Sequence, residues 1–165
     1  MVEYINAKIE DLEKIVDIYN QSIPGRLATA DLEEISVESR VDWFNAHNPE
    51  TRPLWLIKDG EKVLGWISLS DFYGRPAYSK TAEVSIYLDN SAQGQGLGQK
   101  AIEFAESNLE TLGVTTLLSF IFGHNKASLN LFKKNGFEEW GHLPQVALMD
   151  DVERDLDILG KKYED

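Results

Sequence analysis

The sequence predicts an α/β fold, with a mixed sheet covered by helices on both faces, in a single domain over residues 1–165. Three observations predict it. Short β-branched and apolar runs alternate with segments of helical periodicity along the whole chain. Asp59-Gly60 between two apolar runs is typical of a tight β-hairpin turn. The length of 165 residues suits one domain, and the chain shows no repeat, low-complexity tract or linker.

In the first half of the chain, apolar residues at helical spacing from about Asp11 predict an amphipathic helix that Pro24-Gly25 ends. Ser36 suits the cap of a second helix, which Asn48-Pro49 ends. Residues 26–35 lack periodicity and are expected to form a loop. Strands are expected at residues 2–7, 54–58, 62–70 and 81–89, with a loop at residues 71–80.

In the second half, a strong helix is expected to run past Leu112 to Gly113, and residues 114–122 predict a buried strand. A short helix at residues 125–135 follows. Closing strands are expected at residues 137–141, 145–149 and 155–159. Within strand 81–89 the residues alternate, so Glu83 faces away from the apolar set of Ala82 and Val84.

The composition excludes several classes of function. The net charge of −12 disfavours nucleic acid and anionic membrane as partners, because both attract basic surfaces. The chain has no cysteine, which excludes disulfides, thiolate metal sites and cysteine nucleophiles. The three histidines show no metal spacing, so no metal is expected. We expect a cytoplasmic protein, because the first residues lack a secretory pattern and no run approaches the ~18 apolar residues that span a bilayer.

A glycine-rich turn between a predicted strand and a predicted helix is the main functional signal. Gly94, Gly96 and Gly98 let the backbone approach a ligand, and the first amides of the helix lack internal partners, so the turn can cradle a phosphate. The nucleotide-hydrolase loop is excluded because Gln99-Lys100-Ala101 follows Gly98. The dinucleotide fingerprint needs a glycine where Gln99 stands. A plain surface turn is the alternative.

Two further motifs narrow the ligand. Gln93, Gly96 and Gly98 match the segment that opens the pyrophosphate-binding helix of the GNAT family of N-acetyltransferases, which this sequence resembles. Downstream, Asn125 to Ser128 and the closing Gly136-Phe137 match that family's second motif at the right spacing. A narrower similarity, to the branch that acetylates phosphinothricin and methionine sulfoximine, covers residues 17–20, 40–44, 65–68, 75–78 and 81–88.

The resemblance implies acetyl-CoA as co-substrate, a small-molecule amine as acceptor and a homodimer. It also implies that the backbone of Ile86, Tyr87 and Leu88 pairs with the pantetheine arm, with the Leu88 amide polarising the thioester carbonyl as an oxyanion donor does. Asn125 and Ser128 are expected to contact the cofactor, although Asn125 also suits a helix cap. The residues expected to hold the pyrophosphate are Gln93, Gly94, Gln95, Gly96, Leu97, Gly98 and Gln99.

Acetyl transfer needs a neutral amine, and Glu83 is the candidate base; the alternative is an ordinary solvated carboxylate on a strand. Arg75 is expected to receive a substrate carboxylate as a bidentate pair, and Tyr78 to wall the acceptor pocket, with Glu83 beside them; a plain surface loop is the alternative for both. This chain has Phe132 where relatives carry tyrosine or histidine, and Val84 where the branch often has histidine.

The sequence therefore predicts an N-acetyltransferase that acts on an amino-acid-like substrate by direct transfer. Two other functions stay open. The acidic surface would suit a cationic acceptor, such as a polyamine or a protein amino terminus. Phe132, which cannot donate a proton to the leaving thiolate, leaves room for a non-catalytic sensor of acyl-CoA.

Overall fold

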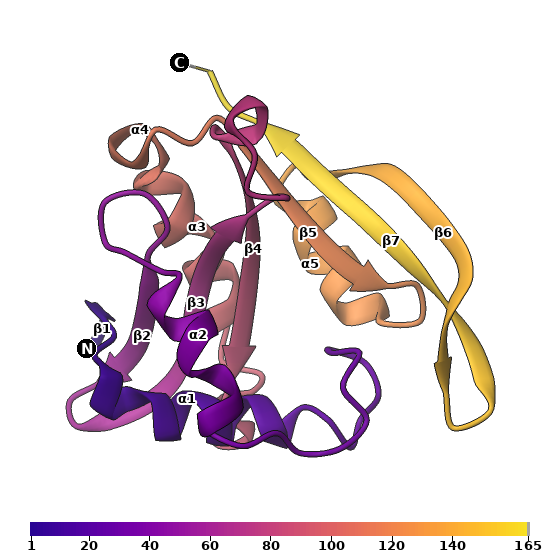
Figure 1. Ribbon diagram of the computed structural model, residues 1–165, viewed down its shortest axis with the longest axis horizontal. Helices are drawn as coiled ribbons and strands as arrows, with labels where there is room; N and C mark the ends of the chain where they lie inside the picture. The colour runs from indigo at the N-terminus through magenta and orange to yellow at the C-terminus, as the bar shows by residue number, and fades with distance from the viewer. Residues whose placement is uncertain (165) are drawn as a thin grey trace.

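The computed structural model of the chain describes residues 1–164 and contains one seven-stranded sheet (Figure 1). The strand order is β1-β2-β3-β4-β5-β7-β6. Only β4 and β5 pair in parallel; the other neighbours are antiparallel. This is the mixed sheet that the sequence predicts. The strands are β1 Val2–Asn6, β2 Leu54–Asp59, β3 Lys62–Asp71, β4 Thr81–Leu88, β5 Thr116–Phe122, β6 Glu138–Met149 and β7 Val152–Lys162.

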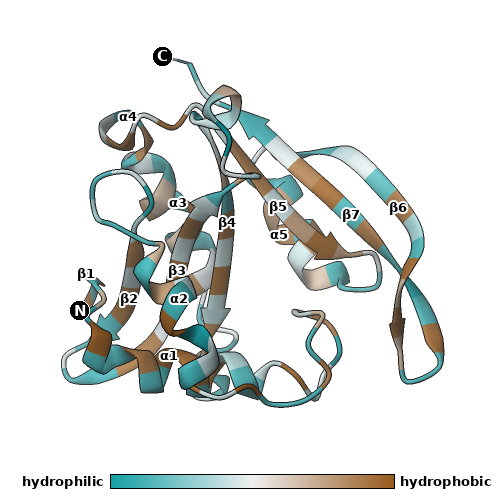
Figure 2. Cartoon of the chain, in the orientation of Figure 1, coloured by the Kyte–Doolittle hydropathy of each residue, from teal (hydrophilic) through white to brown (hydrophobic). Residues whose placement is uncertain are grey.

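Helices cover both faces of the sheet, as expected. In one core, strands β2, β3, β4, β5 and β7 pack against the helices α3, α4 and α5. In a second core, strands β2 and β3 pack against α1 and the loop that follows it, and α2 packs against this core. Figure 2 shows hydrophobic residues concentrated along the central strands. The helices are α1 Leu12–Gln21, α2 Val41–Asn45, α3 Leu97–Ser107, α4 Leu109–Leu112 and α5 Lys126–Lys134, with 3-10 turns at Ile9–Asp11, Glu38–Arg40, Pro76–Tyr78 and Asn90–Ala92.

The prediction of one continuous helix up to Gly113 is wrong, because the structure has two helices there, α3 and α4, which meet at Asn108. The Asn108 side chain donates to the Phe104 carbonyl at 2.9 Å, and its backbone N–H bonds the Ala105 carbonyl. Asparagine competes with helical hydrogen bonds in this way. Gly113 then ends α4 with φ of 74°.

The closing strands also differ from the prediction. Residues 138–141 and 145–149 belong to one strand, β6, and β7 is longer than residues 155–159. The register of β6 against β7 shifts at two places, and Pro144, which has no N–H to donate, lies within the second shift. Because β6 is an edge strand, it tolerates a proline there.

The other elements agree with the prediction to within a few residues. Ser36 accepts a hydrogen bond from the Ser39 amide at 3.2 Å, as a cap does, although the helix it opens begins as a 3-10 turn. Residues 26–35 form a loop. In the described residues, each helix is too short or too polar to cross a membrane.

Candidate active site

A gap opens in the middle of the sheet where β4 and β5 diverge (Figure 1). The two strands pair only from Thr81 to Glu83 on β4 and from Thr116 to Leu118 on β5. Beyond these pairs, two cavities are lined by residues of both the β4 side and the β5–α5 side. The carboxyl ends of two parallel strands therefore enclose a channel instead of a continuous ladder.

The backbone of β4 offers unpaired groups to this channel. The Asp89 amide donates to the Leu64 carbonyl at 2.8 Å, on the β3 side. In an antiparallel pair alternate residues bond the partner strand, so Leu88 and Ile86 point their N–H and C=O groups to the other side. The Gln93 side chain donates to the Leu88 carbonyl at 3.4 Å, which agrees with this direction. The Leu88 and Ile86 amides thus face the channel.

The glycine-rich turn lies at the open end of the channel and begins α3. Gly94 and Gly96 have φ of 76° and 75°, a left-handed conformation that favours glycine. The first helical bond runs from the Lys100 amide to the Gly96 carbonyl, so the amides of residues 97–99 precede it. Gly98 lines the cavity together with Gln93. The turn therefore presents free amides at the positive end of a helix.

The side chain of Gln99 has a structural role. It exchanges two hydrogen bonds with the Asn135 side chain, at 2.7 and 2.8 Å, and so ties α3 to the end of α5. Only its backbone amide is left for a ligand. The Gln95 side chain donates to the Ser91 carbonyl at 3.3 Å, within the turn itself.

The opposite wall of the channel is the start of α5. Asn125 caps this helix by accepting the Ser128 amide at 3.3 Å, and its Nδ2 donates to the Leu27 carbonyl. Ser128 and Phe132, one helical turn apart, both line the two cavities. Asn125 thus has the capping role and also lies at the channel.

Glu83 is the last β4 residue that pairs with β5 before the strands diverge. Its neighbours Ala82 and Val84 are buried in the core beneath α3, so its side chain points to the opposite face of the sheet. It is half-buried, and burial raises the pKa of its carboxyl above the ordinary value. A raised pKa makes this carboxylate a stronger base than an exposed glutamate.

The loop between β3 and β4 lies next to Glu83 in the chain. Phe72, Tyr73 and Tyr78 form an aromatic cluster in it, with ring centroids 4.4 to 6.0 Å apart. Arg75 and Tyr78 line a cavity with Asp71, which shares no lining residue with the two cavities of the channel. The structure thus groups the two expected acceptor residues with each other and places the cofactor channel apart from them.

Comparisons with known proteins agree with this geometry. The profile of the acetyltransferase (GNAT) family matches residues 12–137. The chain is 49% identical over 157 residues to "Putative phosphinothricin acetyltransferase YwnH" of Bacillus subtilis (strain 168), covering 94% of this chain and 96% of that protein. It is 28% identical over 143 residues to the L-methionine sulfoximine/L-methionine sulfone acetyltransferase of Pseudomonas aeruginosa, covering 86% and 83%. A crystal structure described as a putative phosphinothricin N-acetyltransferase matches with a TM-score of 0.96 at 46% identity, covering 100% of both chains.

The chain belongs to the acetyltransferase (GNAT) family. This membership makes it an acyltransferase and confirms the resemblance carried by the two motifs. In this acetyltransferase Phe132 is 5% exposed and packs edge-on against Phe137, with ring centroids 5.0 Å apart. Phe132 is thus a core residue that also lines the channel.

Sequence reasoning missed two residues close to Glu83. Ser70 stands directly opposite Glu83 in the β3–β4 pair. The Nδ1–H of His47 donates to the Trp43 carbonyl at 2.8 Å, and the Ser70 hydroxyl lies 3.2 Å from Nε2. Burial lowers the pKa of His47, which keeps the ring neutral. No sequence spacing links His47 to Ser70, because their contact depends on α2 packing over β3.

A second histidine lies far from the channel, on the β6–β7 ribbon. Ligating atoms of Glu139, His142 and Asp157 lie within 4.8 Å of one another, although the sequence showed no metal spacing. Nδ1 of His142 bonds Asp157 at 2.5 Å and Nε2 lies 3.5 Å from Asp155. The hydrogen bond to Asp157 raises the pKa of His142, which favours the protonated ring beside these carboxylates.

Proposed function

We propose that the protein transfers the acetyl group of acetyl-CoA directly to the amino group of a small amino-acid-like substrate of the phosphinothricin or methionine sulfoximine type. The observation that carries this proposal is the channel between β4 and β5, which begins beyond the partly buried Glu83, the last β4 residue that pairs with β5. Family membership supports the acetyl transfer, and the names of the two relatives support the acceptor class.

The cofactor would lie along the channel. The free amides at the start of α3, including those of Gly96 and Gly98, would hold the pyrophosphate. The channel-facing groups of Ile86 and Leu88 would pair with the pantetheine amides as a neighbouring strand does. The Leu88 N–H would then donate to the thioester oxygen, where negative charge develops in the transition state.

Glu83 would act as the general base. It takes a proton from the acceptor ammonium, directly or through a water, and the neutral amine attacks the thioester carbon. A C–N bond forms, the C–S bond breaks, the nitrogen gives its second proton to water, and the sulfur leaves as a thiolate that takes a proton from solvent. A thiol in water has an ordinary pKa of ~8.5, which allows that departure without a donor at Phe132.

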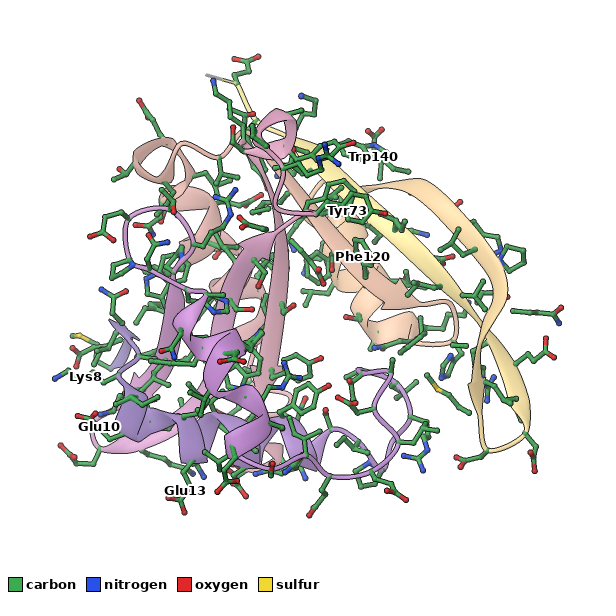
Figure 3. All side chains as sticks on the ribbon, viewed as in Figure 1. Lys8, Glu10, Glu13, Tyr73, Phe120 and Trp140 are labelled. Atoms are coloured by element: carbon green, nitrogen blue, oxygen red, sulfur yellow. The ribbon has the colours of Figure 1, made fainter. Side chains whose placement is uncertain are left out.

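Charge favours an amino acid over a polyamine as acceptor. Arg75 has no ion-pair partner in residues 1–164, so its guanidinium is free for a substrate carboxylate, which a polyamine lacks. The one carboxylate at that cavity, Asp71, is paired with Arg52 at 2.6 Å. An acidic groove that would suit a cation includes Glu10 and Glu13, and Figure 3 shows these two residues at the opposite end of the molecule from Tyr73.

A thiol-release assay tests the proposal. The protein is incubated with acetyl-CoA and, separately, with phosphinothricin, methionine sulfoximine, methionine sulfone, a polyamine and a basic peptide. We expect release of free CoA with the amino-acid analogues and little with the others. Release only with the polyamine or peptide would replace the acceptor class. Tight acetyl-CoA binding without release for any amine would show a sensor instead of an enzyme.

We also propose that the protein works as a homodimer. The β6–β7 ribbon extends beyond the rest of the sheet (Figure 1) and exposes apolar side chains on both strands. Among the apolar side chains of this ribbon, Leu148 and Val146 are the most exposed, at 62% and 58%. Exposed apolar patches of this kind mark interaction surfaces.

A further inference from the structure

Arg52 is a buried cation that takes no part in the proposed chemistry. It is 7% exposed and is the one lysine or arginine that is buried within residues 1–164. Its backbone exchanges two hydrogen bonds with Asn48, at 2.8 and 3.2 Å. The Asn48 side chain in turn accepts from the amides of Glu50 and Thr51. The position of Arg52 is therefore fixed by the turn that precedes β2.

The guanidinium of Arg52 reaches both ends of the loop between β3 and β4. Its Nε donates to Asp71 Oδ1 at 2.6 Å, where β3 ends. One terminal nitrogen donates to the Ser79 carbonyl at 2.8 Å, two residues before β4 begins. The other donates to its neighbour Thr51 at 2.8 Å. A single side chain thus joins the two ends of the loop.

The segment between these two anchors carries the expected acceptor residues. Tyr73 and Gly74 have φ of 61° and 67°, and a left-handed tyrosine costs free energy that the surrounding contacts must offset. Arg75 is exposed, and its carbonyl accepts the Tyr78 amide at 2.9 Å. Among the ion pairs of residues 1–164, the Arg52–Asp71 pair alone involves this loop. Arg75 and Tyr78 also share their cavity with Arg52.

The three hydrogen bonds of the Arg52 side chain depend on the shape of the guanidinium group. The planar guanidinium presents several N–H donors in a fixed fork, and here they serve a carboxylate and two carbonyls in different directions. A lysine ammonium at the same position keeps the charge but is a point donor on a flexible stem. It can pair with Asp71 and leave the Ser79 carbonyl without its partner.

From these contacts we infer that Arg52 is a positioning residue for acceptor recognition: it holds the loop at residues 71–80 so that Arg75 meets the carboxylate of the amino-acid substrate. The inference rests on the proposed function, because it assigns the specificity of that reaction to a residue that touches neither substrate nor cofactor.

Steady-state kinetics of Arg52→Lys test it. We expect KM for methionine sulfoximine to rise about tenfold, the order of effect of one lost hydrogen bond to a charged group, with kcat and KM for acetyl-CoA close to those of the wild type. The preference for the amino acid over its carboxamide, measured as a ratio of kcat/KM values, should fall by a similar factor. Arg154→Lys, on β7, is the matched control and should leave the ratio unchanged.

A double-mutant cycle separates positioning from general damage. If Arg52 acts through Arg75, then adding Arg52→Lys to Arg75→Gln should not lower the preference further. Equal losses with amino acid and carboxamide, or additive losses in the cycle, would overturn the inference and leave Arg52 a stability residue only.

Hydrogen exchange gives a readout that does not depend on the acceptor. The amides of Tyr78 and Ser79, bonded within the loop, should exchange faster in Arg52→Lys, while the β2–β3 hairpin keeps its protection. Unchanged exchange at both amides would contradict the positioning role. Faster exchange in a protein that acetylates no amino acid would instead refute the proposed function and leave the anchoring of the loop in place.

Discussion

At the scale of single residues, Glu83 is a partly buried carboxylate and also the proposed general base. Replacing it by glutamine removes the proposed base and keeps the size of the side chain. We expect kcat to fall on the order of 10²-fold or more, with KM for acetyl-CoA little changed, because a positioned base contributes that much. A pH series of initial rates measures it, and full activity of Glu83→Gln across that series would show that Glu83 is not the base.

The same substitution should stabilise the fold at neutral pH. Burial raises the pKa of Glu83 in the folded state above its unfolded value, so its contribution to stability is present below the unfolded pKa and is lost as pH rises through the folded pKa. Glutamine cannot ionise, so Glu83→Gln should melt at a higher temperature than the wild type at pH 7 and at about the same temperature below pH ~4. A lower melting temperature at pH 7 would show that the buried carboxylate gains more from its surroundings than it loses.

At the scale of elements, the turn before α3 separates cofactor binding from stability. A side chain at Gly96 meets no atom within 4 Å, but its φ of 75° strains any residue with a Cβ. Gly96→Ala should therefore cost about 1–2 kcal/mol of unfolding free energy and shift the amides of the cradle. We expect KM for acetyl-CoA to rise about tenfold while KM for the acceptor stays near the wild-type value.

The β2–β3 turn offers the matched control for that prediction. Gly60 has φ of 62° and, like Gly96, open space around it, but it lies away from the channel. Gly60→Ala should show a similar loss of stability by chemical denaturation and an unchanged KM for acetyl-CoA. If both variants raise that KM equally, the turn before α3 has no special part in cofactor binding.

Elements with strong periodicity could be predicted from the sequence, and those interrupted by one side chain could not. The alternation around Glu83 and the glycines before α3 predicted both strand face and helix start correctly. The break at Asn108 depends on a side-chain bond to Phe104 that hydropathy does not reveal. Continuity of β6 through Pro144 depends on its edge position, which is a property of the whole sheet.

The residues of the candidate site also fall into those that a sequence motif predicts and those that only tertiary contacts bring together. Its cofactor side comes from short contiguous motifs, such as residues 93–99, whose local geometry fixes the chemistry. Its acceptor side is built from contacts across the sheet: Arg52 meets Asp71 across 19 positions, and His47 meets Ser70 across 23. Neither pair has a sequence signature, because tertiary packing alone brings the partners together.

At the scale of the whole molecule, the divided sheet leaves a channel between its two halves. The two halves join at only three residue pairs of β4 and β5. Across the remaining gap, the loop after α1 connects them: the Ala28 carbonyl accepts from Tyr87 of β4 at 3.0 Å, and the Leu27 carbonyl accepts from Asn125 before α5 at 3.2 Å. The gap is thus held at a set width from one side and stays open to a ligand between α3 and α5.

The proposed homodimer would use the other end of the sheet, where β6 is an unpaired edge. Such an edge is a liability in a monomer, and exposed Leu148 and Val146 add apolar area to it. We expect the wild type to sediment at about twice the chain mass of 18.7 kDa, and Leu148→Glu to sediment as a monomer, because a charge buried in the interface lacks a partner. Since Leu148 is 62% exposed in the single chain, the substitution should change the stability of the monomer by less than about 0.5 kcal/mol.

Ile9, which is 52% exposed beside α1, gives the control for that experiment. Ile9→Glu adds the same charge to a different apolar site and should leave the dimer intact. A wild-type mass of one chain at micromolar concentration would refute the dimer, and a monomeric Ile9→Glu variant would move the interface from the β6–β7 ribbon to the α1 face. Because the Arg75 cavity lies within a single chain, the dimer should affect acetylation less than Arg52→Lys does, and a monomeric Leu148→Glu variant that keeps its KM for the amino acid would establish that the acceptor site is complete in one protomer.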